Sequence, residues 1–423
     1  MTGPGKRALV PKLRFPEFRD ADGWAPVTLQ EASVPVAERV GQRKLTPVSI
    51  SAGIGFVPQS DKFGRDISGN QYQLYTLVKD GDFVYNKGNS LKFPQGCVYL
   101  LQGWGQVAAP NVFICFRLRE GYSNVFFQNC FEGNAHGKQL RKHITSGARS
   151  NGLLNISKEN FFGVEIPTPS PSEQQKIADC LSSVDELIAA QTRKLDALKT
   201  HKKGLMQQLF PREGETQPRL RFPEFEDAGE WECKTLEDIA KISSGSTPLR
   251  ANLEFFAEGS IAWVKTTDLN NSFIIETEEK ITPKARARIN PAGSVLVAMY
   301  GGFNQIGRTG CLSVPAATNQ AISVLVMDRK AALPVYVLAW LNAKVEDWKR
   351  IASSSRKDPN ITGSDVSKFP ITFPKTQEQH RIADCLTSLD DLITAQTQKL
   401  QALKTHKKGL MQQLFPSPEE VAA

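Results

Sequence analysis

The sequence predicts an α+β protein: two strand-rich α/β domains joined by two long helices, with a pseudo-twofold internal repeat. A long amphipathic segment occurs twice, at residues 173–211 and 378–416, with 31 of 39 positions identical. The short motif LRFPEF also occurs twice, at residues 13–18 and 220–225. Between these repeated segments lie two blocks of similar length that share little identity. Repeated segments around divergent blocks predict one scaffold used twice to carry two different surfaces.

Each copy of the short motif lies in a connecting segment that precedes one large block. The N-terminal segment, residues 1–26, and the linker, residues 212–231, each continue from LRFPEF to a tryptophan, Trp24 or Trp231. A Thr-Leu pair follows each tryptophan. We therefore predict that the two segments make equivalent contacts. Residues 417–423, after the second long segment, are predicted to form a short tail.

The two blocks, residues 27–171 and 232–374, are predicted to be divergent copies of one fold. Both alternate β-branched or aromatic runs with Gly, Asn, Ser and Pro turns, which is typical of strand-rich domains. The predicted strands are residues 81–85, 97–101 and 112–118 in the first block and 260–265, 293–299 and 321–327 in the second, where residues 334–351 are predicted to form one helix.

The repeated segments predict a central long helix, residues 172–211, and a C-terminal one, residues 375–416. Prolines delimit the segments. Apolar residues recur at alternating steps of four and three, which is the heptad pattern of a coiled coil. The predicted seam consists of Ile177, Leu181, Val184, Ile188, Gln191, Leu195 and Leu198 in the first helix and Ile382, Leu386, Leu389, Ile393, Gln396, Leu400 and Leu403 in the second.

A stripe of this length needs a partner helix, and the other copy has the matching length. Because a large block separates the two copies, we predict that they pair antiparallel. Gln191 and Gln396 occupy matching seam positions, where buried polar residues either fix the register or mark a place where the helices splay apart. The lysine-rich runs at residues 199–203 and 404–408 suit a solvated face near a helix end, and a contact with nucleic acid is the alternative.

Composition narrows the class of protein. The 52 Lys and Arg exceed the 44 Asp and Glu, giving a formal charge of +8, which favours a polyanionic partner. The seven cysteines form no C-x-x-C pair and only five histidines are present, so we expect no metal site. The absence of an apolar leader and of long apolar runs predicts a soluble, cytoplasmic protein.

Polar and basic residues gather in predicted turns of both blocks. Arg can bind guanine through two hydrogen bonds, Asn and Gln can bind adenine, and Ser and Lys suit phosphates, so these turns are candidates for DNA binding. For any single turn, an ordinary solvated loop is the alternative. The candidates are Arg43, Lys44, Asn86, Lys87, Asn89, Arg149 and Asn151 in the first block and Ser246, Thr247, Arg250, Tyr300, Asn304, Gln305, Arg308, Asn319, Gln320, Arg356, Lys357 and Asn360 in the second.

With its repeats and candidate binding turns, the chain resembles the specificity subunits of type I restriction-modification systems. The resemblance is carried by FPITFPKTQEQHRIADCL at residues 369–386 and VEIPTPSPSEQQKIADCL at residues 164–181. The second block adds SGSTP at residues 244–248, IAWVKTTD at residues 261–268 and AATNQAI at residues 316–322. The first block lacks a clear SGSTP loop.

The resemblance implies that each block is a target-recognition domain reading one half of a bipartite, asymmetric DNA sequence, with the helix pair as spacer. It implies a subunit without a catalytic site that docks two methyltransferase subunits for N6-adenine methylation and motor-nuclease subunits for restriction. The chain itself would bind no cofactor; S-adenosylmethionine, ATP and Mg²⁺ would be bound by the partner subunits.

Two other classes of protein are alternatives. A methyltransferase or nuclease in one chain is disfavoured, because no N/D-P-P-F/Y motif, glycine-rich S-adenosylmethionine loop or G-x-x-x-x-G-K-S/T phosphate loop is present. A coiled-coil adaptor that binds only proteins would retain no DNA, whereas binding to phosphates weakens steeply with salt.

Overall fold

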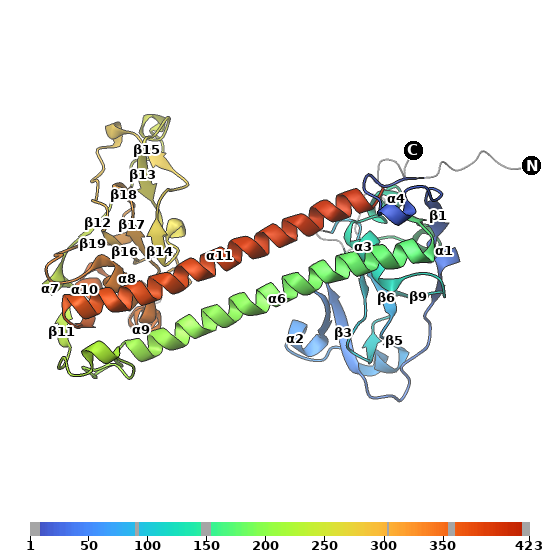
Figure 1. The fold of residues 1–423 in the computed structure, drawn as a ribbon, viewed down its shortest axis with the longest axis horizontal. Helices are drawn as coiled ribbons and strands as arrows, with labels where there is room; N and C mark the ends of the chain where they lie inside the picture. Colours follow the sequence, from blue (N-terminus) through green and yellow to red (C-terminus); the bar gives the residue numbers. More distant parts are fainter. Residues whose placement is uncertain (1–8, 89–92, 145–153, 303, 354–359, 417–423) are drawn as a thin grey trace, which may run out of the picture. The chain divides into compact units, whose positions relative to one another are not determined.

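The computed structural model describes residues 9–88, 93–144, 154–302, 304–353 and 360–416 and divides the chain into two units (Figure 1). The first unit comprises Met1–Gln191 and Lys399–Ala423, and the second comprises Thr192–Gln398. Each unit therefore contains one block and parts of both long helices. The predicted mixture of helices and sheets in two domains is confirmed.

The described residues of the first unit form two four-stranded sheets and a two-stranded ribbon. Short helices connect and cover them: α1 (Leu29–Ala32), α2 (Gln59–Phe63), α3 (Asn124–Glu132), α4 (Gly137–Arg141) and α5 (Lys158–Phe162). The strand orders are β2 (Ser33–Pro35), β9 (Ile114–Leu118), β6 (Asp82–Asn86), β7 (Cys97–Leu100) in one sheet; β4 (Gly55–Pro58), β3 (Thr46–Ser51), β8 (Gln106–Ala109), β5 (Thr76–Lys79) in the other; and β1 (Ala25–Thr28) with β10 (Glu165–Thr168) in the ribbon.

In the part of the second unit that the structure describes, the strands form a five-stranded sheet, a three-stranded sheet and a two-stranded ribbon. Its shorter helices are α7 (Leu236–Ile239), α8 (Pro334–Ala343), α9 (Val345–Ser353) and α10 (Gly363–Ser367). The five-stranded sheet has the order β12 (Ala240–Ser244), β19 (Ile322–Met327), β16 (Val295–Ala298), β17 (Thr309–Leu312), β14 (Ser272–Ile274). The three-stranded sheet has the order β15 (Lys280–Ile281), β13 (Ile261–Val264), β18 (Ala316–Thr318). The ribbon pairs β11 (Glu232–Thr235) with β20 (Pro370–Phe373).

The central strand β16 shows why the larger sheet forms. All four of its residues are buried, because β17 and β19 pair with it on both edges and helices cover the sheet. A continuous apolar run is the pattern expected of such a strand. The predicted strands at residues 81–85, 97–101, 112–118, 260–265, 293–299 and 321–327 all correspond to observed strands, with ends that differ by at most two residues.

The prediction of one helix over residues 334–351 is wrong in one respect. The segment forms two helices, α8 and α9, that are separated at Lys344. Lys344 has φ −106° and ψ 20°, which is outside the helical region, and its ammonium donates to the carbonyl of Pro211 at 2.9 Å. The two helices also differ in composition: α8 is apolar almost throughout, whereas α9 has charged residues along one side.

The long helices are α6 (Pro171–Leu209) and α11 (Thr376–Leu414). In the first unit, Leu414 near the end of α11 joins the core that contains Ile177 and Leu181 near the start of α6. In the second unit, Leu209 at the end of α6 joins the core that contains Ile382 and Leu386 near the start of α11. All fourteen predicted seam residues are buried or half-buried.

The LRFPEF segments make the same contacts in the two units. Leu13 donates its backbone N–H to Gln413 at 2.9 Å, and Leu220 donates to Gln208 at 3.0 Å. The positions 413 and 208 correspond in the repeated sequence.

Within the described residues, no helix is both long enough and apolar enough to cross a membrane.

Candidate nucleic-acid interface

In the second unit, three of the predicted binding loops, and Ile361 just after a fourth, meet at one end of the sheets. The backbone N–H of Ser246 donates to Thr318 at 2.9 Å, and that of Met299 donates to Ala321 at 2.8 Å. Ile361 donates in turn to Met299 at 3.0 Å. These bonds join loops that are far apart in the sequence into a single surface, which we call the reading edge.

The side chains of the reading edge differ in their exposure and in whether they already form hydrogen bonds within the protein. Ser246, Thr247, Asn304 and Gln320 are exposed, and Tyr300 retains 39% of its accessible surface. These five side chains are positioned to contact a ligand. Others are partly used internally: Asn319 accepts from the N–H of Ala321 at 3.2 Å, and Arg308 donates to the carbonyl of Asn304 at 3.1 Å.

Gln305 lies below this surface. Its Oε1 is buried and receives no hydrogen bond from any described residue. A buried amide oxygen without a donor costs free energy, which is tolerated more often at functional sites than elsewhere.

Arg250 is held by an ion pair. Its guanidinium donates to both carboxylate oxygens of Glu279, at 2.6 and 3.2 Å, and lies over the rings of Phe256 and Trp263 at 4.8 and 4.9 Å. The hydrogen bonds from Arg250, together with those from Lys265, lower the pKa of Glu279 to about 2. This geometry favours Arg250 as a support for the loop over a direct contact with a base.

In the first unit, Asn86 and Lys87 also tie loops together. Asn86 donates through Nδ2 to Ile50 at 3.0 Å and accepts through Oδ1 from Gly88 at 2.7 Å. Lys87 donates through Nζ to the carbonyl of Ile156 at 3.0 Å, and its own carbonyl accepts from Leu154 at 2.9 Å. Both side chains thus hold the ends of neighbouring loops in place.

Arg43 and Lys44 lie on a separate loop, and both are exposed. Arg43 pairs with Glu38 at 3.0 Å and donates to the carbonyl of Arg39 at 3.0 Å. The described contacts of this loop run to Tyr72 and Tyr75, so the structure does not bring Arg43 and Lys44 together with Asn86 and Lys87.

The match to a family model decides which family this chain belongs to. The model of the type I restriction modification DNA specificity domain matches residues 80–200 and 228–405, which cover the first block from residue 80 onward, the whole second block and most of both long helices. The chain belongs to this family. The prediction of a specificity subunit, a recognition component and not an enzyme, is thereby confirmed.

Individual relatives agree with this assignment. The specificity subunit of the type I restriction enzyme EcoR124I/EcoR124II of Escherichia coli is 26% identical over 62% of this chain, a region that spans 66% of the relative. The MjaIX specificity subunit of Methanocaldococcus jannaschii is 31% identical over 39% of each protein.

Solved structures share the fold of this specificity subunit. The S subunit from M. genitalium superposes with a TM-score of 0.58 at 14% identity, covering 97% of this chain and 100% of that one. A chain from a type I R-M system, described in terms of complex assembly and conformational transition, gives a TM-score of 0.58 at 17% identity and covers 94% and 98%.

Some predicted binding residues of the specificity subunit lie outside the described residues: Asn89, Arg149, Asn151, Arg356 and Lys357. Asn360 is described; it is half-buried and directly precedes Ile361, whose N–H joins the reading edge.

A basic segment of the second unit was not among the predicted binding residues: Lys280, Lys284, Arg286 and Arg288. All four side chains are exposed, and no acidic residue lies between them in the sequence. Lys284 pairs with Glu254 at 3.2 Å, whereas Lys280, Arg286 and Arg288 have no carboxylate partner among the described residues. The run KITPKARAR, with four basic residues in nine and no acidic one, is the signal in the sequence that marks this segment.

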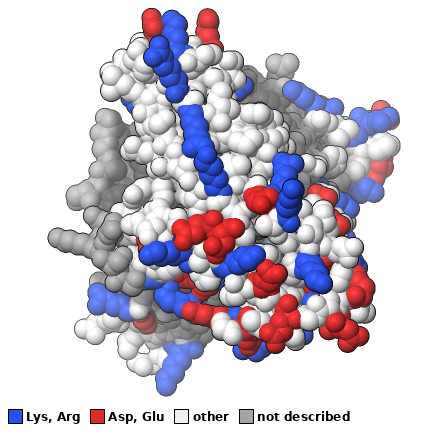
Figure 2. Space-filling model, turned by 90° about the vertical axis from the view of Figure 1, so that its left-hand side faces the viewer, with Lys and Arg blue, Asp and Glu red and all other residues white. Residues whose placement is uncertain are grey.

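The charge on one face of the second unit is unevenly spread. Figure 2 shows acidic side chains gathered in the lower half of this face, whereas lysine, arginine and uncharged side chains dominate the upper half below its top edge. In Figure 1 the three-stranded sheet of β13, β15 and β18 lies at the upper level. A surface low in carboxylates suits a polyanion.

Proposed function

We propose that this chain reads a bipartite, asymmetric DNA sequence for a type I restriction-modification complex, with each unit contacting one half of the target. The observation that carries this proposal is the reading edge, where three sequence-distant loops present exposed Ser, Thr, Asn, Gln and Tyr side chains together. Hydrogen-bonding side chains of this kind discriminate base pairs in the major groove.

The correspondence between the two units supports a division into half-sites. The bond from Ile361 to Met299 follows strand β16, and the bond from Leu154 to Lys87 follows strand β6. The two strands occupy equivalent places in their sheets: β6 lies between β9 and β7, and β16 lies between β19 and β17. The scaffold is thus alike while the loops differ in sequence, so the two units would read different bases.

We further propose that α6 and α11 form an antiparallel coiled coil that sets the gap between the half-sites. Lys407 of α11 pairs with Asp185 of α6 at 2.8 Å in the first unit, and Lys202 of α6 pairs with Asp390 of α11 in the second. Both pairs join the end of one helix to the start of the other. Gln191 and Gln396 would then lie in the seam and fix its register.

The partners follow from the family. The chain would dock two methyltransferase subunits, which bind S-adenosylmethionine and methylate adenine at N6, and motor-nuclease subunits, which use ATP and Mg²⁺ to restrict unmodified DNA. The chain itself would bind DNA and no cofactor, and it would act in the cytoplasm. The repeated LRFPEF and helix segments, being nearly identical, would provide two like docking places for two like partners.

Mapping N6-methyladenine over the host genome by long-read sequencing tests this proposal. A strain carrying the gene is compared with its deletion, and with the deletion complemented by a chimera in which another recognition block replaces residues 27–171. We expect one gapped motif to vanish on deletion and the chimera to change one half of it only. A chimera that changes both halves would contradict the assignment of one half to each unit.

A further inference from the structure

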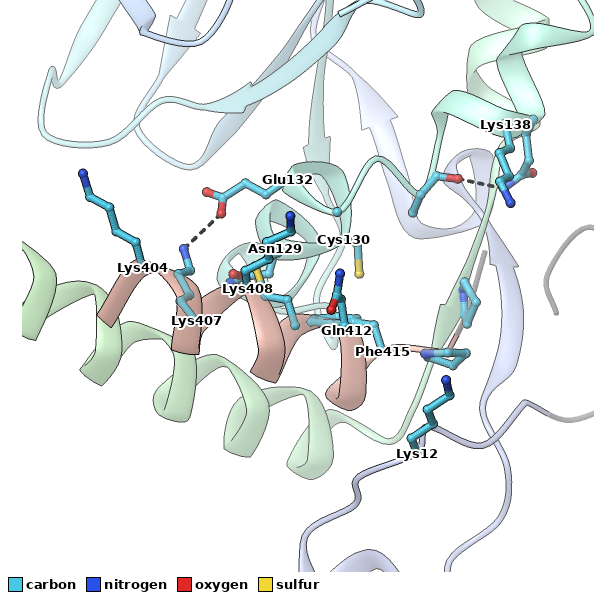
Figure 3. Close-up of a pocket in the computed structure, with 16 residues that line it drawn as sticks. Lys12, Asn129, Cys130, Glu132, Lys138, Lys404, Lys407, Lys408, Gln412 and Phe415 are labelled. Carbon is cyan, nitrogen blue, oxygen red and sulfur yellow. Dashed lines mark hydrogen bonds and ion pairs between the residues drawn. The ribbon is translucent and has the colours of Figure 1, made fainter. Parts of the chain in front are cut away.

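The first unit contains a large groove, and the pocket at the equivalent place in the second unit is much smaller. It has a volume of about 790 Å³ and is lined by α3, α4, the end of α11 and Lys12 (Figure 3). The pocket of the second unit beside Met206 and Ala339, which occupy the places of Met411 and Asn129, has a volume of about 100 Å³.

Equivalent residues of the two units explain the difference. The helices α3 and α8 are held alike: the N–H of Ser123 before α3 donates to Gln174 at 3.0 Å, and the N–H of Leu333 before α8 donates to Gln379 at 2.9 Å. Gln174 and Gln379 correspond in the repeat. Counted from these bonds, Cys130 of α3 stands where α8 has Trp340.

Trp340 fills its place in the second unit completely. Its ring packs edge-on against Phe210 at 5.5 Å, its indole N–H donates to the carbonyl of Pro370 at 3.3 Å, and it is 3% exposed. Phe210 corresponds to Phe415 in the repeat, and Phe415 lines the groove. The small Cys130 therefore leaves room beside Phe415 that an indole occupies in the other unit.

The floor of the groove is apolar and the rim is basic. Cys130, Ala135, Met411 and Phe415 contribute the floor. Figure 3 shows Lys404 and Lys408 extending from α11 at the groove, with Lys12 near Phe415. All three lysines are exposed.

One rim lysine is already neutralised. Lys407 pairs with Glu132 at 3.0 Å and with Asp185 at 2.8 Å. Burial lowers the pKa of Lys407, but these carboxylates more than offset burial and raise the pKa overall. Lys12, Lys404 and Lys408 have no carboxylate partner among the described residues, so the rim carries net positive charge.

We propose that this groove binds an acidic protein segment that inserts one large aromatic side chain beside Phe415. The basic rim complements carboxylates, and the apolar floor accepts a ring as the second unit accepts Trp340. The buried Oδ1 of Asn129, which receives no hydrogen bond from any described residue, offers an acceptor for an incoming N–H. A DNA backbone satisfies the lysines but leaves the apolar floor without a partner, so a protein segment fits better. Because Trp340 fills the equivalent place in the second unit, such a partner binds once per chain.

Methionine-methyl NMR on the full chain tests this proposal. The chain has five methionines, and Met411 in the groove has an internal control in Met206, the matching residue of α6. The probe is the peptide acetyl-Gly-Glu-Glu-Trp-Glu-Glu-Gly-amide, and the same peptide with Ala for Trp is its control. We expect the first peptide to shift the methyl signal of Met411 saturably and leave Met206 in place. Met411→Leu and Met206→Leu assign the two signals.

Matched variants separate the groove from general charge. The double variant Lys404→Glu, Lys408→Glu should lower the affinity for the peptide about ten-fold at low salt, because two attractive charges become repulsive. Lys199→Glu with Lys203→Glu, the same change at the matching positions of α6, should alter affinity less than two-fold. Cys130→Trp should abolish binding by filling the groove; Cys130→Phe replaces it if that variant does not fold. No shift at Met411, equal shifts at Met411 and Met206, or a shift caused by duplex DNA and not by the peptide would overturn the proposal.

Discussion

The guanidinium of Arg221 donates two hydrogen bonds of 2.7 Å to the carboxylate of Glu378, and both side chains are at least nine-tenths buried. Arg14 binds Glu173 in the same way in the first unit, at 2.8 and 2.7 Å. Each pair fastens an LRFPEF segment to the start of a long helix. Removal of one partner would leave a buried charge uncompensated, which is costly.

Arg221→Ala should therefore lower the free energy of unfolding of the second unit by about 3 kcal/mol. Tryptophan fluorescence in urea reports this, since four of the six tryptophans, including Trp231 and Trp340, belong to that unit. Arg381→Ala is the matched control, because the Arg381–Glu224 pair is about half exposed and should contribute less than about 1 kcal/mol. Equal losses in the two variants would mean that burial of the Arg221 pair is unimportant.

The stability of the first unit should fall in mild acid because of His136. This residue is 2% exposed, packs against Tyr85 and Phe131, and burial lowers its pKa from 6.5 to about 4. Below pH 6.5 the imidazole of His136 binds a proton in the unfolded chain, whereas in the folded state it stays neutral down to about pH 4. The free energy of unfolding therefore declines between pH 6.5 and about 4. The loss is about 2 kcal/mol at pH 5.

Urea unfolding of the wild type and of His136→Leu at pH 7.5 and pH 5 measures this effect. The variant should lose less stability between the two pH values by about 2 kcal/mol. An identical pH dependence in both proteins would show that other groups account for the acid sensitivity.

The basic segment should bind DNA through phosphates. Replacing Lys280, Arg286 and Arg288 with alanine should weaken binding alike for all sequences and reduce the salt slope by about 0.9 for each lost phosphate contact. Titrations of the assembled complex at several salt concentrations measure the slope. Lys375→Ala, an exposed lysine at the start of α11, is the control and should leave it unchanged. A changed base preference would instead place the segment in a groove of the DNA.

Two residues of the second unit should respond differently to truncation. Gln320→Ala, on the exposed reading edge, should relax discrimination at one position of one half-site by about 1–3 kcal/mol. Arg250→Ala should lower affinity without changing base preference, because Arg250 is engaged by Glu279 and supports its loop. Competition binding with single-base variants of the target distinguishes these outcomes, and a base-specific loss in Arg250→Ala would contradict the supporting role.

Patterns that repeat along the chain were sufficient to predict much of this protein. The 3.6-residue and heptad periods identified both long helices and a stripe whose residues are all buried or half-buried, since a helix buries its apolar side chains on one face whatever the rest of the chain does. The echo of LRFPEF predicted equivalent contacts, which Leu13 and Leu220 make. The same repeats carried the resemblance to the family.

Tertiary structure decided what each side chain of the candidate site contacts. Arg250 binds Glu279, twenty-nine residues away, and Ser246 reaches Thr318, because strands distant in sequence become neighbours in a sheet. The groove arises from the difference between Cys130 and Trp340, two residues in segments with little common sequence. Local periodicity specifies which face of an element is buried, but the identity of a partner and the space left between side chains depend on packing between elements, which no single segment encodes.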